Sequence, residues 1–268
     1  MAIDQAVTAD SEEDAFSKIL AEGRERLDRS WIDLLATGGI AGIDVAFGVL
    51  ALLYVEKATG STLLGGLAFS IGFIALLLGN SGLFTEGFFV PVTVVVVGDK
   101  KLRILFKYWV GTIVGNLTGG ALVAWIIELA FPSLHHQSIE NAKYYIQGGI
   151  NVRSFALAVL AGGAITLLTR MKIAGTSSDV AKIIASVASA FLLAGVRLFH
   201  SILDSIIAFT ALDTGHATFG YFAWLRWLGF IIIGNIVGGL GLTTIPRLLR
   251  NHRRILDYRA ARTRHDIS

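Results

Sequence analysis

The chain contains no cysteine and only three prolines among its 268 residues. The lack of cysteine excludes a disulfide framework, cysteine-ligated clusters and thiol catalysis, and it leaves the cellular compartment undecided. Charged residues make up 16% of the sequence, below the roughly 25% of soluble domains. Hydrophobic residues make up 54%, and the mean hydropathy is +0.66. These values predict an integral membrane protein. The polar, acidic N-terminus lacks the apolar core of a cleaved signal peptide.

Several functional signatures are also missing. The prolines leave no Asn-Pro-Ala pair, which argues against a typical aquaporin, and no twin histidines lie at mid-membrane, which argues against an ammonium channel. We find no phosphate loop, dinucleotide fingerprint, metal-spaced His/Glu cluster or nucleophile–base pair. The adjacent His135 and His136 fall in an expected outer loop and make a weak metal site. We therefore expect no metal, no cofactor, no nucleic-acid partner and no enzymatic activity.

Six apolar segments approach or exceed the roughly 20 residues that cross a bilayer. Two of them, the second and the fifth, are too long for one straight helix, and polar residues interrupt them at Asn80–Gly87 and at Arg197–Asp204. We expect each of these two to form a half-helix, a loop at membrane depth and a second half-helix. The six segments are Leu34–Val55, Thr62–Val97, Ile104–Phe131, Val152–Leu168, Ile183–Leu212 and Tyr221–Leu248.

Lys and Arg gather in alternate connections. Four precede the first segment, four lie between the second and third or just inside the third, three lie between the fourth and fifth, and seven lie at or after the end of the sixth. The other connections, taken with the first residues of the segments that follow them, carry only one or two each. This alternation predicts six spans in the inner membrane with both termini in the cytoplasm. Three spans per half make the two halves an inverted repeat.

The ends of the chain are polar. Residues 1–33 read as a cytoplasmic amphipathic helix, with Phe16, Ile19, Leu20, Leu27 and Trp31 on one face. It is expected to lie at the membrane interface, and a regulatory plug is the alternative. Residues 34–248 form the six-span channel domain, and residues 249–268 form a basic cytoplasmic tail near lipid headgroups.

A six-residue motif occurs twice, as Gly-Asn-Leu-Thr-Gly-Gly at 115–120 and Gly-Asn-Ile-Val-Gly-Gly at 234–239. Small residues four apart let membrane helices approach closely, and buried amides bond across helices. We expect scaffold roles, with the asparagines bonded to the backbone of the interrupted loops. The residues concerned are Gly115, Asn116, Gly119, Gly234, Asn235 and Gly238. A duplicated half with an interrupted helix is typical of a transporter or channel.

The two interruptions carry the candidate pathway residues. His200 is the one histidine inside an apolar segment, where a buried imidazole is costly unless it is hydrogen-bonded. Thr85 lies 115 residues earlier, close to the 119 that separate the motif copies, so the two should meet at mid-membrane. Leu83 and Phe84 either form a constriction or pack the loop.

Charges within the apolar segments need partners or a polar cavity. Asp204 follows His200 by four residues, so on a helix it would orient or charge the imidazole. Charge balance suggests that Asp44 pairs with Arg197. Glu86 could join them in a polar network. The alternatives for these charges are structural pairs or contact with the pathway.

Four motifs in order resemble the formate/nitrite transporter family: Leu83-Phe84-Thr85, the two Gly-Asn-x-x-Gly-Gly copies, and His200-Ser201-Ile202. The resemblance covers about residues 34–248. It implies an all-helical, aquaporin-like protomer of six spans in an inverted repeat, with broken helices in spans 2 and 5, and a homo-pentamer with one pore per protomer. It further implies movement of small monovalent anions, often with a proton, through Thr85 and His200 past Leu83 and Phe84.

The sequence departs from the family at several of these positions. The family usually reads Glu-Leu-Phe-Thr-Gly-Asn where this chain has Gly82 to Gly87, so the acid has moved past the threonine to Glu86. The family usually has Glu before the central histidine and Asn four residues after it, where this chain has Phe199 and Asp204. These differences indicate a divergent branch, whose substrate and polar network stay open.

Three hypotheses follow. The first is a proton-linked channel or transporter for weak-acid anions such as formate or nitrite. The second is a pore of the same scaffold selecting a neutral solute or a cation, because Asp44, Asp204 and Glu86 would repel anions if they were ionised and unpaired. The third is a scaffold or sensor that signals through its N-terminal segment.

Overall fold

The computed structural model describes residues 2–175 and 178–265, which are almost entirely helical and include no β-strand. Helices occupy all six apolar segments. The helices and helical turns are, in chain order, α1 Ala2–Asp28, α2 Trp31–Thr59, α3 Thr62–Ala68, α4 Ser70–Leu78, η1 Phe84–Phe88, α5 Val90–Val96, α6 Leu102–Ala130, η2 Pro132–Leu134, α7 His135–Ile146, α8 Val152–Arg170, η3 Met171–Gly175, α9 Asp179–Ala190, η4 Phe191–Gly195, α10 Ser201–Asp213, α11 Tyr221–Gly238, η5 Gly239–Thr244, α12 Ile245–Arg250 and α13 His252–His265.

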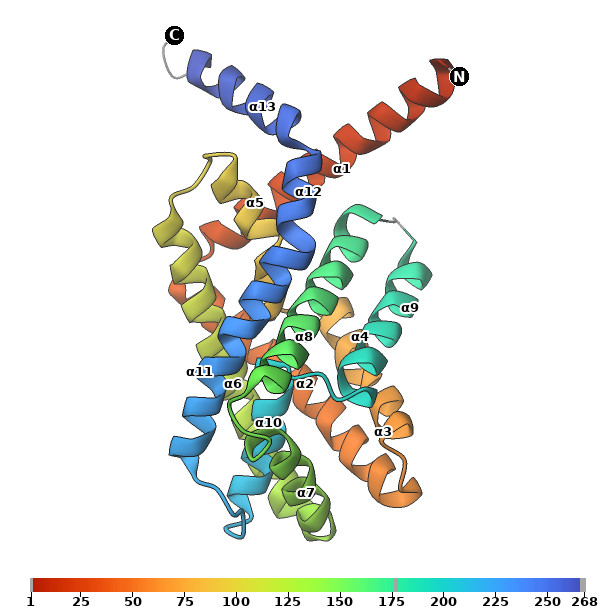
Figure 1. Cartoon of the computed structure of the whole chain (residues 1–268), viewed down its shortest axis with the longest axis vertical. Helices are drawn as coiled ribbons and strands as arrows, with labels where there is room; N and C mark the ends of the chain where they lie inside the picture. Colours follow the sequence, from red (N-terminus) through yellow and green to blue (C-terminus); the bar gives the residue numbers. More distant parts are fainter. Residues whose placement is uncertain (1, 176–177, 266–268) are drawn as a thin grey trace.

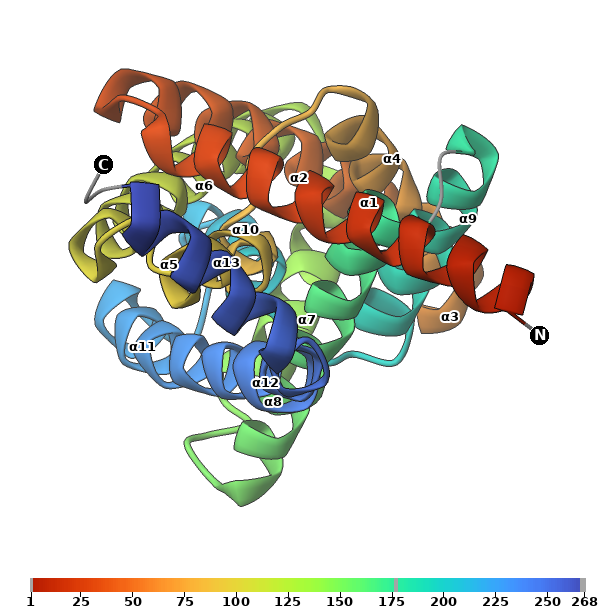
Figure 2. The ribbon, with the colours of Figure 1, turned by 90° about the horizontal axis from the view of Figure 1, so that it is seen from above.

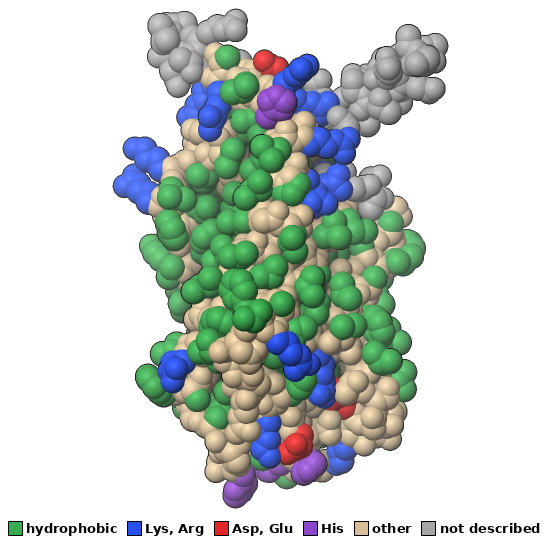
Figure 3. All heavy atoms as spheres, in the orientation of Figure 1, with side chains coloured by type: hydrophobic (Ala, Val, Ile, Leu, Met, Phe, Trp, Pro, Cys, Tyr) green, Lys and Arg blue, Asp and Glu red, His purple; other side chains and the backbone are tan. Residues whose placement is uncertain are grey.

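Both termini lie at one end of an elongated bundle, which we call the terminal end (Figure 1). The α2–α3 connection and α7 lie at the opposite end. In the described chain, four helices are long and apolar enough to cross a membrane: Trp31–Thr59, Leu102–Ala130, Val152–Ile173 and Tyr221–Arg250. A wide apolar zone covers the face in Figure 3, with Lys and Arg towards both ends. Exposed side chains such as Phe47, Leu122 and Ile233 are suited to contact with lipid.

Glycine allows the long helices to pack in two close pairs, α2 with α6 and α8 with α11. A Cβ added at Gly119 would lie 2.0 Å from the carbonyl oxygen of Gly39, and one at Gly238 would lie 1.8 Å from that of Val159. Both distances are far below van der Waals contact, so a larger residue would push the backbones apart. The predicted packing role of the motif glycines is thereby explained in both halves.

The same C-terminal motif ends the helix before each interruption. The N–H of Ser81 bonds to the carbonyl oxygen of Leu76, and the N–H of Leu198 bonds to that of Leu193. This six-residue closure requires a left-handed residue just before its donor. Asn80, with φ 49°, and Arg197, with φ 57°, supply it. Asparagine tolerates this region, whereas arginine adopts it at a cost that surrounding contacts must offset.

Several boundaries differ from the sequence prediction. The second interruption ends at His200, so Asp204 lies in the first turn of α10. The connection between the third and fourth apolar segments forms the amphipathic helix α7, which places His135 and His136 at a helix start and not in a loop. An additional bend at Phe69 separates α3 from α4.

The N-terminal segment is helical as predicted, and α1 crosses the terminal end over the bundle (Figure 2). Leu20 and Leu27 are buried against Val94 of α5. Trp31 does not join this apolar face: it begins α2, and its side chain is 51% exposed.

The tail forms the helix α13, which Asp99 connects to α1. The Asp99 carboxylate accepts hydrogen bonds from Arg24 at 2.8 Å, Tyr258 at 3.1 Å and Arg262 at 2.5 Å. Partial burial, followed by the negative charge of Asp99, raises the pKa of Tyr258 above its ordinary value. The basic tail is therefore tied to the N-terminal helix through this carboxylate and through a direct hydrogen bond from Arg24 to the Tyr258 hydroxyl.

Replacing Gly238 by alanine should separate α8 from α11 and lower the melting temperature in detergent, because overpacking costs about 1–3 kcal/mol. Gly241→Ala is the matched control, since a Cβ there meets no atom within 4 Å. Equal melting temperatures for the two variants would contradict the packing role of Gly238.

Candidate functional site

The first interruption is held by the side chain of Asn116 in α6. Its Oδ1 accepts a 2.8 Å hydrogen bond from the backbone N–H of Phe84. Its Nδ2 donates to the carbonyl oxygens of Gly82, at 2.8 Å, and Gly38, at 2.9 Å. Asn116 is fully buried. One amide thus pairs the loop backbone with the helix backbone behind it, where water is not available to do so.

Asn235 in α11 holds the second interruption in the same way. Its Oδ1 accepts from the N–H of Ser201 at 2.9 Å. Its Nδ2 donates to the carbonyl oxygens of Phe199 and Ala158, both at 2.9 Å. The predicted bonding of the two asparagines to the loop backbones is confirmed, and the contacts correspond one to one between the halves.

His200 caps the N-terminus of α10. Its Nδ1 accepts the backbone N–H of Leu203 at 3.1 Å. Because Nδ1 uses its lone pair in this bond, a neutral imidazole carries its proton on Nε2, an assignment that follows from the hydrogen-bond network. Nε2 lies 2.8 Å from Oγ1 of Thr85, to which it then donates.

The predicted meeting of Thr85 and His200 is confirmed by this contact, and both residues are fully buried. The hydroxyl accepts from the imidazole and keeps its own hydrogen for a third group. An acceptor beside Thr85, such as an anion, would complete the chain of donors. The Thr85 hydroxyl is therefore a hydrogen-bond donor in otherwise apolar surroundings.

The pair lies between two cavities. Glu86, directly after Thr85, lines a cavity of about 650 Å³ at the terminal end. Phe199, directly before His200, lines a cavity of about 500 Å³ on the other side, together with Tyr144 and Arg197. We call these the terminal-end cavity and the opposite cavity.

Apolar side chains separate each cavity from the pair. Leu83 is fully buried and, with Phe73 and Leu76, lines a narrow space with no room for a water-sized sphere. Phe84 packs edge-to-face on Phe88, with ring centroids 5.1 Å apart. Leu83 therefore faces a constriction, whereas Phe84 packs the loop against its neighbours.

On the opposite side, Phe199 occupies the position directly before His200. Its ring lies 5.8 Å from that of Tyr144, 5.4 Å from that of Tyr145 and 6.4 Å from that of Trp227, measured between centroids. Phe199 is 2% exposed. An aromatic cluster therefore closes this side.

The predicted pairing of Asp44 with Arg197 is wrong. Asp44 accepts a 2.5 Å hydrogen bond from the hydroxyl of Ser81. Arg197 pairs with Glu56, at 3.6 Å, and donates to Asn141, at 3.0 Å. Asp44 and Glu56 are twelve residues apart on α2, about 18 Å along the helix, so charge balance could not reveal which acid faces the arginine.

Asp204 also differs from expectation. Its Oδ2 accepts the backbone N–H of His200 at 2.8 Å, and it does not bond to the imidazole. The four-residue spacing was informative, because it places the carboxylate over the first turn of α10. The acid thus closes the turn that carries the histidine and does not charge the ring.

Glu86 joins none of the other predicted acids. Its Oε1 lies 2.8 Å from Nζ of Lys172, and the two side chains are 3% and 11% exposed. In the sequence, Lys172 was informative only as one of the positive charges that orient the spans. Glu56, Asn141 and Tyr144 were not predicted to lie at the site. Only folding brings these residues together, although charges at segment ends were a signal for Glu56 and Lys172.

No cluster of three His, Asp or Glu side chains suited to a metal occurs in the described part of the chain. His135 instead pairs with Glu128.

The comparisons with known proteins agree with one another. The family described as "Formate/nitrite transporter" matches residues 13–249. The chain is 25% identical over 236 residues to "Inner membrane protein YfdC" of Escherichia coli (strain K12), covering 82% of this chain and 73% of that protein. Among solved structures, an "FNT family ion channel" has a TM-score of 0.78 at 17% identity, covering 89% of this chain and 99% of that chain. A "Pentameric formate channel with formate bound" has a TM-score of 0.62 at 20% identity, covering 89% and 98%. At these identities the two structures show a shared fold.

Replacing Asn116 by alanine should lower stability by about 3 kcal/mol, because it leaves three buried backbone groups unpaired. The melting temperature in detergent measures the effect. Thr118→Ala on the same helix is the control: its exposed hydroxyl only donates to the Val114 carbonyl, and it should shift stability by less than about 0.5 kcal/mol. Equal effects of both substitutions would contradict the bridging role.

Proposed function

The chain belongs to the formate/nitrite transporter family, and we propose that it carries small monovalent weak-acid anions, formate, nitrite or a similar ion, linked to proton movement. The observation that carries the proposal is the buried contact between Thr85 and His200, located where two helix interruptions meet. As a member of a transporter family, the chain is not an enzyme.

The proposed scaffold has six spans in an inverted repeat, with broken helices in spans 2 and 5. The matching contacts of Asn116 and Asn235 support it. The positive charges at the terminal end support cytoplasmic termini. The channel domain spans residues 34–248, flanked by cytoplasmic segments at 1–33 and 249–268. The relatives described as an inner membrane protein and a pentameric channel support an inner-membrane homo-pentamer.

The proton linkage follows from the cost of moving charge. Placing a bare carboxylate in a dry constriction costs about 20 kcal/mol by Born estimates, and several kcal/mol after relaxation. Protonating an acid of pKa about 3.9 at pH 7 costs about 4 kcal/mol. The neutral acid therefore passes Leu83 more easily than the anion, and its dissociation on the far side releases the proton.

Thr85 and His200 hold the solute at the centre. The Thr85 hydroxyl donates to an oxygen of the solute, and the Nε2–H of His200 donates to that hydroxyl. Protonation of Nδ1 would break its bond with the N–H of Leu203, so the geometry favours a neutral imidazole. We propose that the anion takes its proton from water in the cavity and that the pair orients the resulting acid.

The contacts of the acids weaken the case for a cation or neutral-solute pore. That hypothesis requires Asp44, Asp204 and Glu86 to be unpaired. Lys172 neutralises Glu86, whereas Asp44 and Asp204 bond to neutral donors, the Ser81 hydroxyl and the His200 backbone N–H, so the argument against that hypothesis rests on Glu86, the acid that lines the terminal-end cavity.

Proteoliposomes given a formate gradient should take up formate and acidify inside, faster at external pH 5 than at pH 7.5, because more of the acid is protonated. Nitrite, hydrosulfide, lactate and acetate gradients define the range of substrates. No anion uptake, or a current that reverses at the potential of a cation, would contradict the proposal.

Thr85→Val removes the hydroxyl at nearly constant volume and should lower formate uptake by about tenfold to 100-fold. His200→Asn should have a similar effect while retaining an acceptor that caps α10. The two effects should not add, since both break one donor chain.

Thr210→Val is the matched control, because that buried hydroxyl of α10 bonds only to the carbonyl of Ile207. Normal formate uptake by folded Thr85→Val protein would contradict the proposed role of the Thr85 hydroxyl.

A further inference from the structure

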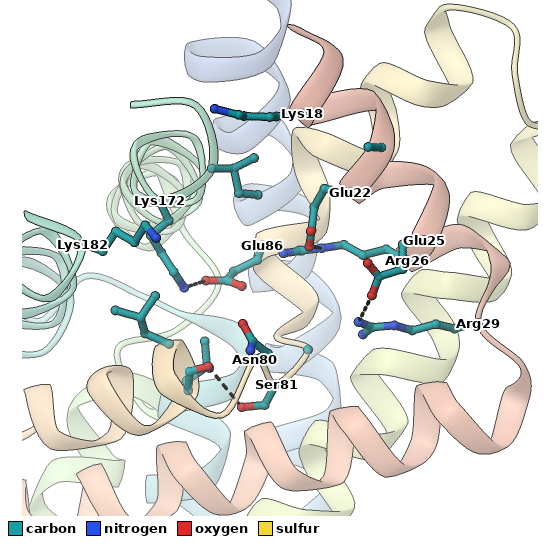
Figure 4. A pocket seen from close by; sticks show the side chains of 15 residues that line it. Lys18, Glu22, Glu25, Arg26, Arg29, Asn80, Ser81, Glu86, Lys172 and Lys182 are labelled. Carbon is teal, nitrogen blue, oxygen red and sulfur yellow. Dashed lines mark hydrogen bonds and ion pairs between the residues drawn. The ribbon is translucent and has the colours of Figure 1, made fainter. Parts of the chain in front are cut away.

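The terminal-end cavity is lined by charges of both signs (Figure 4). Five cations outnumber three carboxylates in its lining: Lys18, Arg26, Arg29, Lys172 and Lys182 against Glu22, Glu25 and Glu86. The cavity therefore favours anions and concentrates them at the terminal end.

Glu86 differs from the other two carboxylates. Glu22 pairs with Arg26 at 2.7 Å and Glu25 with Arg29 at 3.3 Å, both along α1 and four residues apart. Glu86 reaches across to Lys172, 86 residues away in the sequence, in a pair that is almost completely buried.

The Glu86–Lys172 pair lies where the wide cavity meets the narrow one. Both residues line the terminal-end cavity, and both also line the constricted space beside Leu83. A solute moving from the wide cavity into the constricted space beside Leu83 must pass this pair. Because Thr85 and Glu86 are adjacent, movement of the carboxylate occurs directly beside the central donor.

A second cation faces the same carboxylate. Figure 4 shows Glu86 between Lys172 and Arg26. The Nε of Arg26 donates to Glu22, whereas its Nη1 is buried with no hydrogen-bond partner in the described part of the chain. A buried donor without a partner is costly, so this nitrogen marks a position that an acceptor could fill.

We propose that Lys172 and Arg26 form an anion-binding site and that the Glu86 carboxylate occupies it as a tethered anion, which a permeating monovalent anion replaces. This inference rests on the proposed function and assigns the step before the constriction. The ligand is a small carboxylate or an isosteric oxyanion, because it must bind where a carboxylate binds.

The exchange avoids the cost of isolated charge. A buried lysine without a counter-ion is strongly destabilising, so the site holds one negative group at all times. When an anion binds Lys172, Glu86 moves into the wide cavity, where water and other cations accept it. When Glu86 returns, it displaces the anion, which takes its proton from water in the cavity and passes Leu83 towards Thr85 as the neutral acid, so tight binding does not trap the solute.

The test is the concentration dependence of formate uptake in proteoliposomes. In Glu86→Gln the tethered competitor is absent, and the half-saturating formate concentration should fall by about tenfold. Glu86→Asp keeps a shorter carboxylate, reaches Lys172 less well, and should give an intermediate value. Lys172→Met removes the site and should raise the half-saturating concentration above that of the wild type.

Asp28→Asn is the matched control. Asp28 pairs with Lys100, is 59% exposed and lines neither of the two cavities, so its loss should leave the half-saturating concentration unchanged. An unchanged value in Glu86→Gln and Glu86→Asp, with normal wild-type uptake, would overturn the inference and leave the proposed function intact.

A binding measurement distinguishes failure of the proposed function from failure of the proposed anion-binding site. If wild-type protein carries no formate, the proposed function fails, and the site is tested in detergent by the melting temperature with and without formate. The site predicts a larger formate-induced rise in Glu86→Gln than in the wild type and none in Lys172→Met. Equal rises in all three proteins would overturn it.

Discussion

Two interrupted helices inside an apolar bundle must have their backbone groups paired without water, and the rest of the structure depends on this constraint. Asn116 and Asn235 meet it with the same three hydrogen bonds each. An amide suits the task, since one side chain both donates and accepts. The neighbouring glycines allow the paired helices to approach closely enough for these short side chains to reach across.

The candidate site is a consequence of how the interruptions end. A helix that restarts at Ser201 leaves free N–H groups, and His200 and Asp204 satisfy two of them. The bond to Leu203 selects the tautomer of His200, which directs Nε2–H at Thr85. The local requirement of a helix N-terminus thereby determines which donor faces the centre of the protein.

The unusual charges of this chain are distributed over separate contacts and do not form one network. Arg197 holds the second interruption to α2 and α7 through Glu56 and Asn141. Its guanidinium carbon also lies 4.9 Å from the centroid of the Tyr144 ring. These contacts explain how an arginine is kept in a left-handed conformation. Glu86 and Lys172 line the terminal-end cavity, whereas Arg197 lines the opposite cavity, so the two sides of the candidate site differ in chemistry as well as in shape.

The sequence alone determined the membrane class, the six apolar segments, the positions of both interruptions and the pairing of Thr85 with His200. The membrane class, the segments and the interruptions depend on local composition. The pairing of Thr85 with His200 depends on the repeat, because a nearly constant separation in sequence relates equivalent positions of the two halves. Only the tertiary structure decided the partners of Asp44, Arg197, Asp204 and Glu86, and it also revealed α7. A charge in an apolar segment shows that some partner is required, but its identity depends on helix rotation and depth, which lie in no single stretch of sequence.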